Sequence, residues 1–97
     1  MEVEYEATFR NIDKDEIRKK LDQLGASLVR PEFMQKRMVF NLPVGHEKPG
    51  GWLRVRDEGD KITMSLKVVD GSSIEDQKEL QLDINSFESG VALLESI

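Results

Sequence analysis

The chain has 97 residues, a formal net charge of −5, a charged fraction of 34% and no cysteine. This length predicts one small domain, residues 1–97, and the acidic balance argues against nucleic acid or an anionic membrane as a general partner. The lack of cysteine excludes a disulfide framework and a thiolate metal site, and the short apolar runs predict no membrane span, so we expect a cytoplasmic protein.

Glutamates occupy every second position near the N-terminus, at residues 2, 4 and 6. In a strand this spacing places all three on one face, and we predict a strand from about Glu2 to Arg10. Like charges in a row repel, and glutamate is a poor strand former. The face is therefore either exposed to water or in contact with a cation.

A helix is predicted next, because both of its ends carry sequence signals. Asp13 is the expected N-cap, Glu16 completes a capping box, and Gly25 is placed to end the helix. The spacing of Ile17, Leu21 and Leu24 produces one apolar stripe. We expect this stripe to pack on the apolar face of a sheet.

Four more strands and a short helix complete the predicted order. Alternation begins again at Phe33, continues through a hairpin whose turn contains Gly59, and returns in the stretch "QKELQLDI". Ser86 is the expected cap of the final helix. Because the connections are short, the strands should pair antiparallel. The predicted class is α+β, with an antiparallel sheet of about five strands and two helices.

In every predicted strand, the positions that alternate with the apolar ones are polar. The charges on this polar face are segregated by strand. Acids come from the first and last strands, whereas bases come from the middle three. This face carries Glu4, Glu6, Thr8, Gln35, Arg37, Arg54, Arg56, Thr63, Ser65, Lys67, Glu79, Gln81 and Asp83. One interpretation is a solvated sheet face. The other is a triphosphate site, in which Arg and Lys clamp phosphate oxygens and carboxylates hold a divalent metal.

Three stretches, "EYEATF" before a capped helix, "GGWLRVRDEGDKITMSLK" and "DQKEL", resemble the N-terminal half of a CYTH domain. This is the triphosphate tunnel family of class IV adenylyl cyclases, thiamine triphosphatases and inorganic triphosphatases. The family opens with an ExExK strand. Glu4 and Glu6 match its two acids, and Thr8 stands where the family has lysine. Glu2, Glu4 and Glu6 form a second register, which places glutamate there instead.

The later motifs follow in the same order. The family's "LRxR" strand is matched by Arg54 and Arg56, the next strand by Ser65 and Lys67, and the one after it by Glu79. The resemblance implies half of a CYTH-type tunnel barrel. It also implies a site in which Mg²⁺ or Mn²⁺ is held by Glu4, Glu6 and Glu79, and phosphates are bound by Arg37, Arg54, Arg56 and Lys67.

The implied activity is metal-dependent binding of a nucleoside or inorganic triphosphate, with hydrolysis or cyclisation. No residue identifies the attacking nucleophile, so the catalytic residues stay unassigned. The alternative is a non-catalytic, anion-binding or self-assembling fragment of a CYTH domain. Since an open half-barrel exposes two sheet edges, we expect self-association, with a homodimer that completes the barrel as one form of it.

Overall fold

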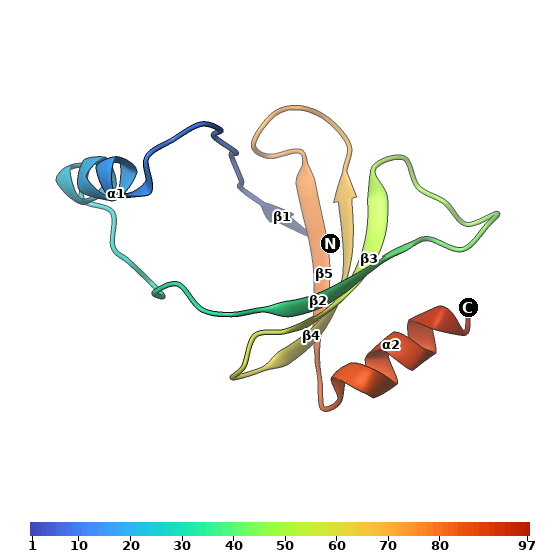
Figure 1. The fold of residues 1–97 in the computed structure, drawn as a ribbon. Coiled ribbons are helices and arrows are strands. Elements are labelled where there is room, and N and C mark those ends of the chain that lie inside the picture. Colours follow the sequence, from blue (N-terminus) through green and yellow to red (C-terminus); the bar gives the residue numbers. More distant parts are fainter.

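The computed structural model describes the whole chain, Met1–Ile97, as one five-stranded sheet with two helices (Figure 1). The α+β class and the number of strands are as predicted. The elements in chain order are β1 (Glu2–Glu4), α1 (Lys14–Gln23), β2 (Lys36–Asn41), β3 (Gly51–Asp57), β4 (Ile62–Val69), β5 (Gln77–Ile84) and α2 (Phe87–Glu95). No helix is of the length and apolar character that a membrane crossing needs.

All neighbouring strands pair antiparallel, in the order β1-β5-β4-β3-β2. The predicted hairpin is β3 and β4, whose turn places Gly59 at a φ of 88°. β1 and β2 are the two edges of the sheet. Four antiparallel steps separate them, so these two strands run in the same direction, and the connection that contains α1 passes from one edge to the other.

β1 is shorter than predicted. It ends at Glu4, which pairs with Gln77 at the start of β5. Beyond this point the chain facing β1 is the loop before β5, and a single bond from the Glu6 amide to the Ile74 carbonyl at 3.3 Å continues the contact. The expected strand to Arg10 is therefore wrong, because the partner strand begins too late to pair with it.

α2 covers part of the apolar face of the sheet. Ser86 caps it, with its hydroxyl oxygen accepting from the Ser89 amide at 3.1 Å. Gly90 allows the close approach, since a Cβ there would lie 2.6 Å from the Ile84 methyl and 3.2 Å from a Val55 methyl. Val55 is fully buried beneath the helix.

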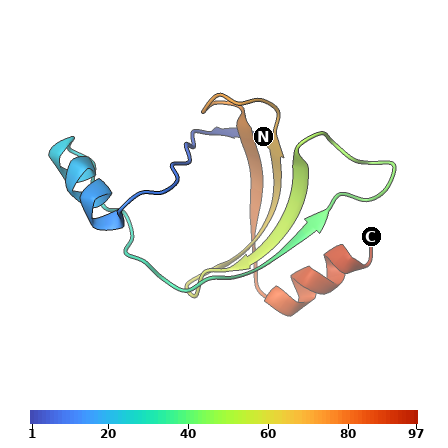
Figure 2. The same cartoon turned by 45° about the horizontal axis from the view of Figure 1, so that its top comes forward.

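α1 has the predicted ends but not the predicted packing. The Asp13 carboxylate accepts from two amides of the first turn at 3.0 Å, and Gly25 follows the helix with a φ of 83°. No residue of α1 is buried, and Leu21 and Leu24 are exposed. Figure 2 shows the sheet curved, with α2 on its convex side and α1 standing away on the other.

Connections without helix or strand, residues 5–13 and 24–35, join α1 to β1 and β2, and α1 does not pack on the apolar face on which it was expected. Its ion pairs are local instead, and Arg18 contacts Glu32 of the following connection. The radius of gyration is 15.9 Å. A compact chain of this length would have roughly 12.5 Å.

Burial is reversed relative to an ordinary two-faced sheet. The concave face, defined by the polar phase of the five strands, includes the buried residues Arg54, Thr63, Ser65 and Lys67. On the convex face Leu80 and Leu82 of β5 are 53% and 58% exposed, because α2 lies over β2, β3 and β4. The interpretation of the polar face as a simple solvated surface is therefore wrong for its centre.

Candidate functional site

The strand register brings the polar side chains together in rungs across the concave face. One rung runs from Arg37 through Arg56 and Thr63 to Asp83. The next joins Arg54, Ser65 and Gln81, and the third joins Trp52, Lys67, Glu79 and Glu2. Residues directly opposite each other in antiparallel strands share a face and lie close together. The predicted segregation of bases and acids thus becomes a basic side and an acidic side.

The basic cluster consists of Arg37, Arg54 and Arg56. Arg54 is 6% exposed, and its pKa is lowered, first by burial and then by the positive charge of Arg56. The Nε atoms of Arg54 and Arg56 are buried and have no hydrogen-bond partner within the protein. A buried guanidinium with free donors is costly unless an anion meets it.

Counter-ions reach the basic cluster only at its margins. A terminal nitrogen of Arg56 lies 3.2 Å from Glu58, and one of Arg54 lies 3.7 Å from Glu79. Arg37 forms no ion pair. Positive charge therefore exceeds negative charge here, although the whole chain is acidic.

The acidic cluster consists of Glu4, Glu6 and Glu79, which surround the ammonium group of Lys67. Lys67 Nζ lies 2.9 Å from Glu4 Oε2, 3.7 Å from Glu6 Oε2 and 3.5 Å from Glu79 Oε2. The distance between Lys67 and Glu4 is short enough for a hydrogen bond, but the angles are not those of one. Glu4 Oε2 and Glu79 Oε2 are buried and accept no hydrogen bond. The alternating glutamates of the N-terminus therefore do contact a cation, and that cation is the ammonium group of Lys67.

The same cluster decides how a metal ion would fit. Carboxylate oxygens are the ligands that Mg²⁺ and Mn²⁺ prefer, and two oxygens here have unused hydrogen-bonding capacity. No group of three or more acids or histidines is spaced as a metal site in this arrangement, with Lys67 among the carboxylates. Lys67 therefore occupies the position among these carboxylates that a divalent cation would need.

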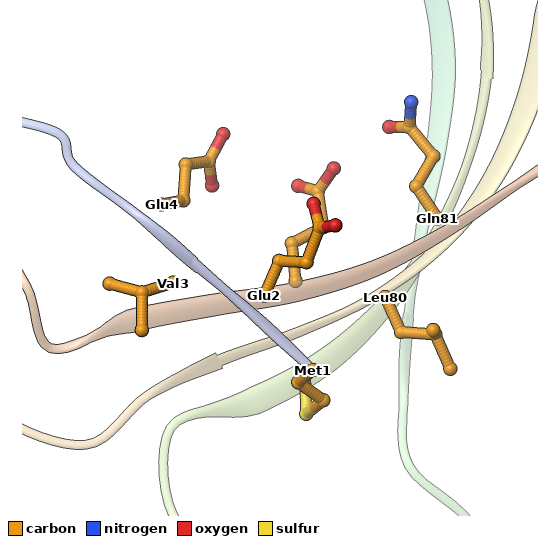
Figure 3. Close-up of a pocket in the computed structure, with 7 residues that line it drawn as sticks. Met1, Glu2, Val3, Glu4, Leu80 and Gln81 are labelled. Carbon is orange, nitrogen blue, oxygen red and sulfur yellow. The ribbon is translucent and has the colours of Figure 1, made fainter.

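A shallow cavity of about 600 Å³ opens beside the acidic cluster, along β1 and β5. Figure 3 shows Glu2, Glu4 and Gln81 on one side of the two strands and Val3 and Leu80 on the other. Glu4 and Glu79 of the acidic cluster thus line this cavity together with Glu2. The arginines of the basic cluster do not line this cavity.

The structure places the predicted site residues of the strands on the concave face, and Glu6, beyond the end of β1, reaches it at Lys67. It adds Glu58, and it brings Thr63, which the sequence put on this face without a role, next to the arginines. Glu58 is buried and contacts both Arg56 and Lys61. Glu58 follows Arg56 by two residues, as Arg56 follows Arg54. This alternation could have assigned Glu58 to the same face from the sequence. Thr63 Oγ1 is a buried donor without a partner, next to Arg56 in the register.

The concave face thus combines an excess of positive charge at its basic side with three carboxylates around Lys67 at its acidic side. Rigid strands present both groups of charges, and no histidine or cysteine takes part. Comparison of the chain with protein-family models, curated proteins and solved structures found no match.

Proposed function

We propose that the concave face binds the phosphate groups of a nucleoside or inorganic triphosphate. The observation that carries this proposal is the adjacent pair of Arg54, which is buried, and Arg56, which is partly buried. The Nε donors of both have no partner within the protein. Arg37 and the Thr63 hydroxyl border the same region. Guanidinium groups bind phosphate oxygens through paired, charge-assisted hydrogen bonds. The resemblance to the CYTH family is the reason to choose triphosphate among polyanions, and in this proposal the open sheet corresponds to half of a tunnel barrel.

Lys67 connects the two sides of the site in this proposal. It lies on the strand next to Arg54 and Arg56, and its ammonium group now neutralises three carboxylates. A bound phosphate would compete for this ammonium group, and Glu4, Glu6 and Glu79 are the residues that would hold Mg²⁺ or Mn²⁺. The metal supplies charge neutralisation of the phosphates when it is bound.

The chemical outcome depends on the group that attacks the bound phosphate. Water gives hydrolysis, and a ribose hydroxyl gives cyclisation; the residues of the concave face bind and orient the phosphates in either case. Binding without turnover is the second candidate. It is favoured by the open sheet, which forms no closed tunnel around a bound phosphate, and by Thr8 at the position of the family lysine.

The proposal is tested by calorimetric titration of tripolyphosphate and ATP into the intact chain, with and without Mg²⁺. We expect binding of both ligands and tighter binding with metal, because the metal relieves repulsion between the carboxylates and phosphate. Arg54→Met with Arg56→Met should abolish binding, whereas Arg10→Met with Lys19→Met, which also removes two positive charges but at exposed positions, should not. Failure of the intact chain to bind either ligand would refute the proposal.

A phosphate-release assay and analysis for a cyclic nucleotide then separate the candidates. Release of phosphate that is lost in the arginine double variant supports hydrolysis. Binding with neither product supports the non-catalytic candidate.

A further inference from the structure

The outer edge of β2 is the feature that the proposed function leaves unused. Two hydrogen bonds at the ends of the β3–β4 pair show which backbone groups of β2 have no partner, through the alternation of bonds along the strands. The Glu58 amide donates to the Lys61 carbonyl and the Val69 amide to the Gly50 carbonyl, both at 2.9 Å. Bonded and non-bonded pairs alternate along an antiparallel ladder. Arg54 and Arg56 therefore direct their backbone groups toward β4, and Val55 directs its own toward β2.

The same alternation carries across to β2. Met38, which pairs with Val55, bonds to β3, as does Phe40. Arg37, Val39 and Asn41 consequently present their N–H and C=O groups outward. These groups have no partner strand, since β2 is the last strand of the sheet.

This edge has only part of the usual protection against pairing, because its charged residues, Lys36 and Arg37, stand at one end of the strand. β2 has six residues and no proline, whereas the opposite edge, β1, has three residues. Met38 is 45% exposed and Val39 is 55% exposed. A regular edge with exposed apolar side chains is a template for another strand.

We propose that β2 pairs antiparallel with β2 of a second copy of this chain, across a two-fold axis perpendicular to the sheet, with Val39 opposite the partner's Val39. Direction favours this partner. Because β1 and β2 run the same way, joining β2 to β1 of another copy by translation, or by rotation about the strand direction, gives a parallel pair. Pairing of β2 with itself is antiparallel, like every other pair in the sheet.

The side chains favour the Val39 register. It sets Met38 against the partner's Phe40 on the convex face and Arg37 against the partner's Asn41 on the concave face. Centring the axis on Arg37 would oppose two guanidinium groups. Centring it on Phe40 or Asn41 would require an amide hydrogen from Pro43, which has none. Centring it on Met38 would set Arg37 against the partner's Val39, a charged group against an apolar one.

This pairing makes one continuous sheet from two chains. Because the axis is perpendicular to the sheet, both concave faces lie on the same side, and the two basic clusters flank the junction. The pairing itself uses no group of the proposed phosphate site other than Arg37, so it is tested without phosphate or metal.

The test is the mass in solution of the intact chain, measured by sedimentation or by light scattering after gel filtration. We expect a dimer. Val39→Lys and Val39→Glu should each shift the protein to monomer, because each sets like charges opposite each other at the axis. An equimolar mixture of the two variants should restore the dimer. Val44→Lys and Val44→Glu, at an exposed loop position, are the matched controls and should stay dimeric.

Val39→Pro provides a second variant. It removes an outward N–H and leaves the ladder with β3 intact, so circular dichroism should show the native fold and the mass should be that of a monomer. A monomeric wild-type chain at millimolar concentration would overturn the proposal, as would a dimer unaffected by all three Val39 variants. A tighter dimer of Val39→Glu would place Val39 against the partner's Arg37 and overturn the register.

Discussion

Replacement of Arg54 by methionine separates the two roles that a buried arginine can have. The side chain is almost fully buried, and its lowered pKa means that folding places the positive charge in an unfavourable environment. For a base with a lowered folded-state pKa, this penalty is present at every pH below that pKa, including neutral pH. Glu79, which loses Arg54 in the variant, keeps Lys67 at 3.5 Å. The unliganded variant should therefore be at least as stable as the wild type.

The size of the effect follows from the contacts. Exchanging a whole buried ion pair for apolar side chains is often neutral or stabilising by about 1–4 kcal/mol. Arg54→Met removes one partner and leaves Glu79 paired with Lys67, so the gain in stability should lie at the low end of this range. Each kcal/mol corresponds to roughly 4–8 °C in Tm for a domain of this size. Loss of one charge-assisted hydrogen bond to phosphate costs about 1.5–3 kcal/mol, which is roughly a ten- to hundredfold weaker Kd for tripolyphosphate.

The assay is a pair of measurements on one variant. Differential scanning calorimetry gives the Tm without ligand, and isothermal titration gives the Kd for tripolyphosphate, with Arg10→Met as control. We expect an unchanged or higher Tm together with the weaker Kd. A Tm lower by several degrees with an unchanged Kd would refute the reasoning and make Arg54 a structural residue.

The remaining predictions concern the helices and one ion pair. Asp13→Ala should reduce the helical circular dichroism signal of α1 and leave the global Tm unchanged, whereas Ser86→Ala should lower the global Tm, each through a cap worth about 1 kcal/mol, since only α2 packs on the sheet. Gly90→Leu should destabilise the protein by about 1–3 kcal/mol in chemical denaturation, because its side chain would displace α2; a stabilised variant would contradict the packing. Hydrogen bonds and ion pairs from Arg18 and Lys14 lower the pKa of Glu32, so the stabilising contact should persist above the unfolded pKa and be lost as pH falls through the lowered one; an NMR carboxyl titration that is the same in wild type and Arg18→Met would exclude this contact.

Local patterns predicted most of the sheet and both helices. Alternation assigned each residue of β3 and β4 to the correct face, and the caps at Asp13 and Ser86 marked where the helices begin, because these signals depend on neighbours in the chain. The position of α1 and the length of β1 depend on distant partners. An apolar stripe shows that a helix can pack against another surface, but it does not show where in the fold the helix lies.

The candidate site was predicted to a similar extent. The phase of the strands placed Arg54, Arg56 and Glu79 together on one face. It did not show that Lys67 would lie among three carboxylates, because that position depends on strand order as well as on phase. Glu58 was assigned to a turn, although its phase continues that of the arginines into the buried region.

The reversed burial of the sheet changes which positions accept substitution. In most proteins a library of random variants rejects polar residues at leucines and accepts them at serines and threonines. Here Thr63 and Ser65 have 0% and 2% exposure, while Leu80 and Leu82 are more than half exposed. A selection for folding should therefore accept lysine or glutamate at the two leucines and reject large residues at the two hydroxyl positions. A hydropathy-guided redesign that enlarged Ser65 would fill the space beside Arg54 that its neighbours in the rung need.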